Sequence, residues 1–180
     1  MSTLSTSAQR VQDALDAAGV TTRIVEYDVP ARTSAEAAAV LGCAVGQIAK
    51  SLVFKAASGA PVLVIASGAH RVDEAKIAAL AGEGIGKADP GFVRATTGYA
   101  IGGIPPLGWA GTPGAPRFDA EPPPEAALHA DATRSRIFID RNLLAFDTVY
   151  AAGGTPHAMF PIAPAELVRV TQGTVADTAP

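Results

Sequence analysis

The chain contains little of what several large classes of protein require. Cys43 is its single cysteine in 180 residues, which excludes an intramolecular disulfide and a zinc site built from cysteines. No apolar stretch approaches the length of a membrane-spanning helix, and no basic segment leads into an apolar run near the N-terminus. These absences predict a soluble, cytoplasmic protein.

Charged and aromatic residues are also scarce, at 17% and 6% of the sequence, and the net charge is −3. Most proteins that bind nucleic acids present a basic face, so overall electrostatics would not draw a nucleic acid to this chain. A nucleic-acid partner would have to be recruited by local lysine and arginine side chains or by a third protein.

What the chain does contain is hydrophobic residues (48%), 18 glycines and 14 prolines, a composition typical of a globular protein rich in turns. Its length suits a single domain over residues 1–180. The most irregular part is a Pro-, Gly- and Ala-rich surface excursion at about 109–135, with at most a short helix at 125–129.

Apolar spacing and turn residues predict both helices and strands. Thr33 and Glu36 have the capping-box pattern of a helix start, and residues 58–61 form the turn of the clearest hairpin. Helices are expected over 11–18, 33–41, 73–80, 89–94 and 164–170, and strands over 23–27, 51–55, 62–66, 98–103, 136–140 and 148–151. This mixture of hairpins and helices predicts an α+β fold around a mixed sheet.

Several familiar catalytic and metal-binding motifs are absent. Segment 82–87 resembles a phosphate loop but lacks the four-residue gap between glycines and the Ser or Thr after the lysine, so a glycine-rich turn is predicted there. There is no Gly-x-Ser-x-Gly elbow and no His-Glu-x-x-His motif, which disfavours a serine hydrolase or zinc protease. His70 and His129 have no companion ligands at a recognisable spacing, so neither a metal site nor a cofactor is expected.

The order of the remaining short motifs resembles that of one known family. They are Thr33 to Ala38, Gln47 to Phe54, Asp89-Pro90, Thr97 to Tyr99, Gly102 to Gly108 and Gly153-Gly154. Together they are similar to the YbaK/ProX family, whose domain also occurs inserted in some bacterial prolyl-tRNA synthetases. The resemblance covers about residues 21–171. It implies a mixed, mostly antiparallel, barrel-like sheet flanked by helices, with one cleft for the aminoacylated 3′ end of tRNA.

The activity implied by the resemblance is hydrolysis of the ester that joins a wrongly attached amino acid to tRNA. The implied substrate is tRNA for proline carrying Ala, Ser, Thr or Cys, and prolyl-tRNA synthetase is a candidate second partner. Neither a membrane nor DNA is expected as a partner. Two alternatives stay open: a non-catalytic module that binds aminoacyl-tRNA or a nucleotide, and a hydrolase for another small activated ester.

An aminoacyl ester is already activated, so the protein must mainly hold the terminal adenosine, place a water and stabilise the oxyanion. Lys50 beside the central hairpin suits the holding role and is predicted to be catalytic, although a lysine at a strand end can be merely solvated. Ser51 is predicted to bind the substrate. A Ser–Lys nucleophile is disfavoured, because sequence neighbours on a strand point to opposite faces.

The Gly-x-x-x-Pro loop is the second part of the predicted site. Gly102 and Gly103 lack a Cβ and can therefore offer backbone N–H groups to the substrate, which gives them a predicted catalytic role. Ile104 and Pro106 are predicted to bind the substrate beside them, with proline stiffening the loop. An ordinary tight turn is equally compatible with the local residues.

A late glycine-rich segment is the third part of the predicted site. Its glycines permit close approach to a ligand, and a histidine there could bond the substrate or a water. A lone histidine more often has a structural role, and in the resembling family the substrate's own groups can assist the water, so general-base catalysis is the less favoured interpretation. The residues predicted to bind substrate here are Gly153, Gly154, His157 and Met159.

The excursion at 109–135 follows the predicted Gly-x-x-x-Pro loop directly. It is longer than expected for the resembling family, which puts the identity of the removed amino acid in doubt. One hypothesis makes it a flap over the cleft or a contact with tRNA, using Trp109, Arg117, Arg134 and Arg136. A passive insertion is the equal alternative.

Overall fold

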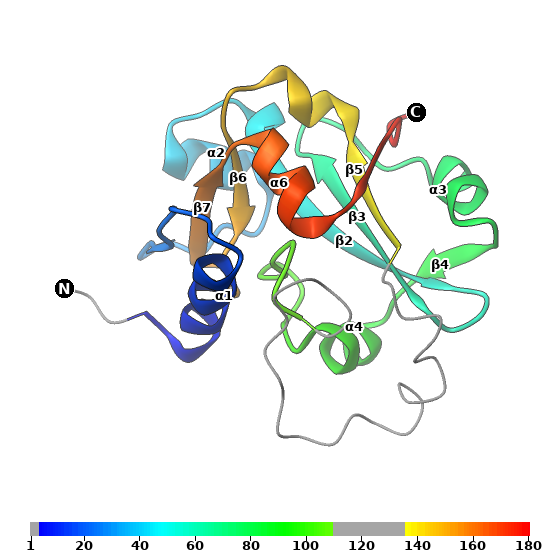
Figure 1. Ribbon diagram of the computed structural model, residues 1–180, viewed down its shortest axis with the longest axis horizontal. Coiled ribbons are helices and arrows are strands. Elements are labelled where there is room, and N and C mark those ends of the chain that lie inside the picture. Colours follow the sequence, from blue (N-terminus) through cyan, green and yellow to red (C-terminus); the bar gives the residue numbers. More distant parts are fainter. Residues whose placement is uncertain (1–3, 110–135) are drawn as a thin grey trace.

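The computed structural model describes residues 4–109 and 136–180, where five α-helices surround one mixed sheet of eight strands (Figure 1). The helices are α1 (Thr6–Ala17), α2 (Ser34–Leu41), α3 (Glu74–Ala81), α4 (Pro90–Thr97) and α6 (Pro164–Thr171). The strands are β1 (Val25–Glu26), β2 (Ile48–Ala56), β3 (Pro61–Ser67), β4 (Ile85–Lys87), β5 (Arg136–Asp140), β6 (Val149–Ala152), β7 (Ala158–Ile162) and β8 (Thr174–Ala176). The predicted α+β class and mixed sheet are confirmed.

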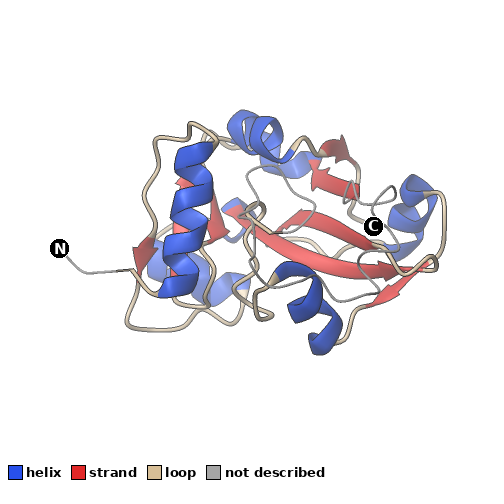
Figure 2. Cartoon of the chain, turned by 60° about the horizontal axis from the view of Figure 1, so that its bottom comes forward, coloured by secondary structure: helices blue, strands red, loops and turns tan. Residues whose placement is uncertain are grey.

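The sheet runs in the order β1-β7-β6-β2-β3-β5-β8, and β4 pairs with β2 beside this path. Four pairings are antiparallel, β1–β7, β2–β3, β2–β4 and β6–β7, and three are parallel, β2–β6, β3–β5 and β5–β8. The long hairpin of β2 and β3 lies at the centre, where the sequence predicted it. Figure 2 shows these long strands with helices on either side.

Buried side chains form three clusters on the two faces of the sheet. The largest joins α1, α6 and the loop after α4 to one face and includes Leu15, Tyr99, Leu107 and Trp109. On the other face, α3 packs through Ile77 against β2 and β3, and α2 packs against β7 and the start of β2. Alternate residues of the central strands therefore face different cores.

Local sequence signals account for most helix ends. Thr33 and Glu36 form the predicted capping box of α2, and Gly42 ends that helix in the left-handed conformation. The Asp89 side chain accepts a hydrogen bond from the Phe92 N–H at the start of α4, with Pro90 in its first turn. No helix within residues 4–109 and 136–180 is long and apolar enough to cross a membrane.

Two local predictions are wrong. Residues 98–103, expected as a strand, instead follow α4 and turn the chain. Gly98 (φ 77°) caps the helix in the left-handed conformation, and Gly102 (φ 93°) turns the chain again. Segment 82–87, expected as a turn, contributes β4, because Ile85 to Lys87 pair with the end of β2. Strands β7 and β8 were not predicted.

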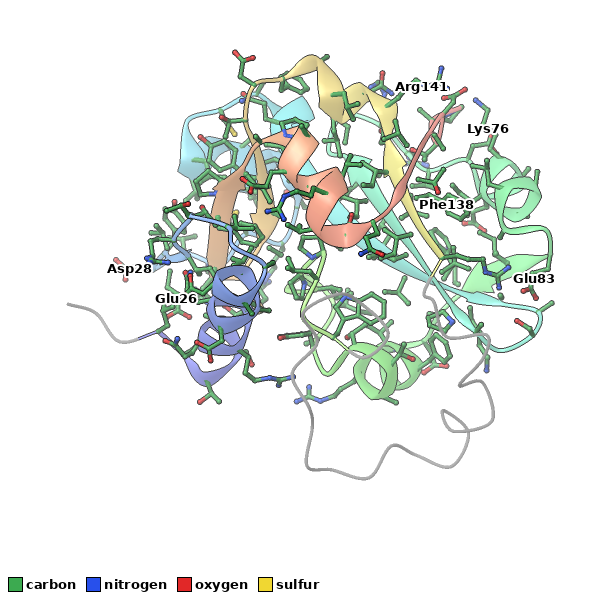
Figure 3. All side chains as sticks on the ribbon, in the orientation of Figure 1. Glu26, Asp28, Lys76, Glu83, Phe138 and Arg141 are labelled. Atoms are coloured by element: carbon green, nitrogen blue, oxygen red, sulfur yellow. The ribbon has the colours of Figure 1, made fainter. Side chains whose placement is uncertain are left out.

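The excursion lies largely outside the described residues, and so do the predicted helix at 125–129, Arg117, Arg134 and His129. At its boundaries, the suggested contact residues already have structural partners. Trp109 is fully buried and its Nε1 donates to the Pro105 carbonyl at 3.1 Å. Arg136 bonds to the Ala81 carbonyl and forms an ion pair with Glu83, a residue that lies near α3 and β4 (Figure 3). Trp109 is therefore not available for tRNA in this conformation, whereas Arg136 stays partly exposed.

Candidate functional site

The candidate site lies where one side of β2 has no strand partner. Residues Ala49 to Lys55 of β2 pair with β3. On the other side, β6 pairs only with Ile48 and Ala49, and β4 pairs only with Phe54 to Ala56. No strand of the described residues pairs with this side between these two stretches. A cleft of about 370 Å³ occupies the gap, and residues 50–54 form one of its walls.

The opposite wall of the cleft comes from the loop after α4, with Ile101 and Ile104, and from Val93 of α4. Val93 and Ile104 are almost fully buried, whereas Ile101 is 56% exposed. The predicted residues Lys50, Ser51 and Ile104, which are far apart in sequence, therefore meet at one cleft. An apolar wall beside a few polar groups is the usual composition of a small-molecule site.

Lys50 is held at the rim by a hydrogen bond from its Nζ to the His70 carbonyl at 2.5 Å. Partial burial lowers the pKa of Lys50 below that of an ordinary lysine. The charge of Asp140 acts in the opposite direction, and the charge of Arg71 lowers the pKa further. The ammonium is therefore partly desolvated, a state in which it interacts strongly with an oxygen anion of a ligand.

Ser51 lies on the other face of the strand. Lys50 and Leu52 point toward the face of α3, since Leu52 packs with the Ile77 cluster, whereas the neighbour Val53 packs with the α1 cluster on the face of Ser51. Ser51 and Lys50 thus lie on opposite faces of the strand, as expected for sequence neighbours, which disfavours a Ser–Lys nucleophile. The Ser51 Oγ is buried and has no hydrogen-bond partner among the described residues.

Two further cationic side chains, which the sequence interpretation missed, line the cleft. Arg71 follows β3 in a loop, and Lys87 ends β4. Together with Lys50 they place three cationic side chains on the lining, against the single carboxylate of Glu74. The cleft is thus locally basic although the chain carries a net charge of −3. Lys87 was overlooked because segment 82–87 was predicted to be a turn, and no local signal marks Arg71.

The Gly102–Gly103 turn packs against the late glycine-rich segment. A Cβ at Gly103 would lie 2.7 Å from the Cα of Thr155, and one at Gly102 would lie 3.7 Å from Pro156. Two predicted parts of the site therefore touch each other. The Gly103 N–H donates to the Ala100 carbonyl at 3.1 Å, whereas the Gly102 N–H makes no backbone hydrogen bond of this kind to another residue that the structure describes.

Buried side chains anchor the loop that follows α4. Tyr99, Leu107 and Trp109 are between 0% and 2% exposed, and Pro106 is buried with them. Gly108 (φ 83°) passes against α1, where an added Cβ would lie 3.0 Å from Ala14. This packing anchors the loop next to the cleft.

The late segment supports the site from a distance rather than lining the cleft. A Cβ at Gly153 would meet Ile24 at 2.9 Å, and one at Gly154 would meet the Ser7 carbonyl oxygen at 2.6 Å, so both glycines allow close packing. The His157 Nδ1 lies 3.0 Å from the Tyr27 carbonyl oxygen. Met159 is 7% exposed in the cluster around α2.

The described residues contain no group of three or more His, Cys, Asp or Glu side chains placed to hold a metal ion. A second hollow of about 260 Å³ lies between the start of α6 and residues 20–22. It contains none of the predicted site residues. The cleft at β2 is therefore the site that the sequence and the geometry share.

Comparison with known proteins agrees with this fold. Residues 28–170 match the aminoacyl-tRNA editing domain family. A crystal structure of a proposed trans-editing enzyme for prolyl tRNA synthetase is 38% identical, with a TM-score of 0.82 and 99% of each chain covered. The hypothetical protein APE2540 is 31% identical, covering 95% of this chain and 99% of that one, with a TM-score of 0.76.

A curated relative, the uncharacterized protein YwhH of Bacillus subtilis (strain 168), is 26% identical over 144 residues, which cover 80% of this chain and 78% of that protein. The family match extends over most of the sequence. The chain belongs to the aminoacyl-tRNA editing domain family, which confirms the resemblance to the YbaK/ProX type.

Proposed function

We propose that the chain is a trans-editing deacylase that hydrolyses the ester of a mischarged aminoacyl-tRNA. The observation that carries the proposal is the β2 cleft, where Lys50, Ser51 and Ile104 meet beside two further cations in a member of the editing-domain family. The proposed substrate is tRNA for proline that carries Ala, Ser, Thr or Cys. The similarity to a proposed trans-editing enzyme for prolyl tRNA synthetase supports this choice.

In the proposed reaction, a water oxygen attacks the ester carbonyl carbon and forms a tetrahedral intermediate. The bond from that carbon to the ribose oxygen then breaks, the ribose oxygen takes up a proton, and free amino acid and tRNA leave. Lys50 supplies positive charge to the terminal phosphate, the ribose or the carbonyl oxygen, and the Gly102 N–H is a candidate donor to the oxyanion. Gly103 positions that loop through its close packing against Thr155, and Pro106 is buried beneath it.

Arg71 and Lys87 extend the basic lining from Lys50 along the cleft and suit the phosphates of a tRNA 3′ end. Local charge of this kind offsets the acidic net charge of the chain. Delivery of tRNA by prolyl-tRNA synthetase is part of the proposal, since the chain carries a net charge of −3 whereas most nucleic-acid-binding proteins present a basic face.

The test is deacylation of tRNA for proline charged separately with Ala, Ser, Thr and Cys. Lys50→Ala is compared with wild type and with Lys55→Ala, because Lys55 is an exposed lysine of the same strand that does not line the cleft. The proposal predicts rapid loss of one or two esters, abolished at Lys50 and retained at Lys55. Binding of the aminoacylated 3′ end without turnover would instead identify a non-catalytic module.

A further inference from the structure

The unpaired stretch of β2 exposes backbone hydrogen-bonding groups to the cleft. The Gly68 N–H donates to the Ile48 carbonyl at 2.7 Å, so Ile48 directs its backbone groups toward β3. The Ala57 N–H donates to the Gly84 carbonyl at 2.8 Å, so the backbone groups of Ala57 point away from β3, toward the side of β4. Because these groups alternate along a strand, Ser51 and Val53 direct theirs toward the side that β6 and β4 leave uncovered.

No described loop compensates for the missing strand partner. None of the backbone hydrogen bonds outside the ladders involves Ser51 or Val53 in the described part of the chain. The Ser51 Oγ, buried and also without a described partner, adds a side-chain group at the same residue. A buried hydroxyl without a partner is costly unless a ligand or water satisfies it.

These groups fit the polar atoms of an amino acid. A residue placed opposite Leu52 in a parallel ladder donates its nitrogen to the Ser51 carbonyl and accepts from the Val53 N–H at its own carbonyl. A residue placed opposite Ser51 in an antiparallel ladder donates to the same carbonyl and accepts from the Ser51 N–H. In either direction, the Ser51 carbonyl receives the amino group and a strand N–H polarises the ester carbonyl.

We infer that the uncovered edge of β2 binds the aminoacyl group of the substrate as a one-residue strand addition. The α-amino group donates to the Ser51 carbonyl oxygen, with the Ser51 Oγ as a second acceptor. This inference rests on the proposed function and specifies how that site distinguishes an amino acid from other acyl groups. Binding through backbone groups also leaves the side chain of the amino acid free to meet the apolar wall of Val93 and Ile104.

An adenine ring could use the same acceptor and donor, but the surrounding residues favour the amino acid. Base recognition in single-stranded nucleic acids commonly includes stacking on an aromatic ring. Phe54 is the one aromatic residue on the described lining, and it packs into the α3 cluster at 7% exposure. The edge groups are therefore assigned to the aminoacyl part, and adenine becomes an outcome of the test.

The test measures binding of two non-hydrolysable amides, 3′-alanylamino-3′-deoxyadenosine and its 3′-propionylamino counterpart, which lacks the amino group. We expect the full chain to bind the alanyl compound about tenfold more tightly, the effect of one well-placed hydrogen bond. Ser51→Ala should reduce that ratio, and Ser58→Ala, an exposed serine at the hairpin turn, should not. Ser51→Ala should not lower the melting temperature, because its hydroxyl has no described partner.

Equal affinity for the two amides would overturn the inference. The inference would also be overturned if replacing adenine by uracil reduced affinity more than removing the amino group does. In that case the edge of β2 would bind the base instead of the aminoacyl group. Both readouts are independent of turnover. The inference can therefore fail while Lys50-dependent deacylation is observed, and the proposed function can fail while the amide ratio is retained.

Discussion

Replacing Lys50 by methionine separates the chemistry of the cleft from its stability. Met keeps most of the length of the side chain and removes the ammonium, which is partly buried and bonds to the His70 carbonyl. Removal of one well-aimed donor to a developing charge typically lowers kcat by about 10²–10³. We therefore expect the single-turnover deacylation rate to fall by about 100-fold.

The same substitution should change the free energy of unfolding very little. Losing one hydrogen bond costs about 1 kcal/mol, and relief of a partly desolvated charge opposes that loss, because burial lowers the pKa of Lys50 and thus disfavours its charged form. Urea unfolding followed by circular dichroism measures the difference. A rate within threefold of wild type, or destabilisation above about 3 kcal/mol, would show that Lys50 has a structural role instead.

Three further predictions concern the neighbourhood of Lys50. Because the pKa of Lys50 is lowered, affinity for 3′-propionylamino-3′-deoxyadenosine, which has no titrating amino group, should decline with rising pH before ordinary lysines titrate. Lys50→Arg should bind this compound independently of pH over that range, and a coincident decline in both proteins would contradict the prediction. Gly103→Ala should destabilise the fold by about 1–3 kcal/mol through overpacking, whereas Gly84→Ala, with open space around it, should not; thermal melting compares the two. The double variant Arg71→Ala/Lys87→Ala should bind tRNA with a weaker dependence on salt. The slope of log affinity against log salt concentration should become shallower by about one unit for each phosphate that the variant no longer neutralises. An unchanged slope would show that tRNA does not contact these two side chains.

The elements that the sequence predicted well are those fixed by local chemistry. The capping pair Thr33 and Glu36 defines α2, and the turn at 58–61 defines the central hairpin. Residues 98–103 were wrongly predicted as a strand. Their apolar and glycine residues suit a strand as well as a turn, and the sequence does not reveal that this segment packs under α1. Burial of Tyr99 in the main core is a tertiary effect.

The candidate site shows the same division. Lys50, Ser51 and the Gly-x-x-x-Pro loop could be selected from motifs, because each motif is contiguous. The uncovered edge could not, since it arises from a parallel pairing between Ala49 and Ala151 and an antiparallel one between Lys55 and Gly86. Such distant register leaves no local trace in the sequence.

The most direct test of the account is the fate of the ester on mischarged tRNA for proline in the presence of the full chain. The account predicts that at least one of the Ala, Ser, Thr and Cys esters is lost well above its spontaneous rate, that Lys55→Ala retains this activity, and that Lys50→Ala loses it. Spontaneous rates for all four esters, or equal rates in the two variants, would contradict the assignment of the β2 cleft as the editing site.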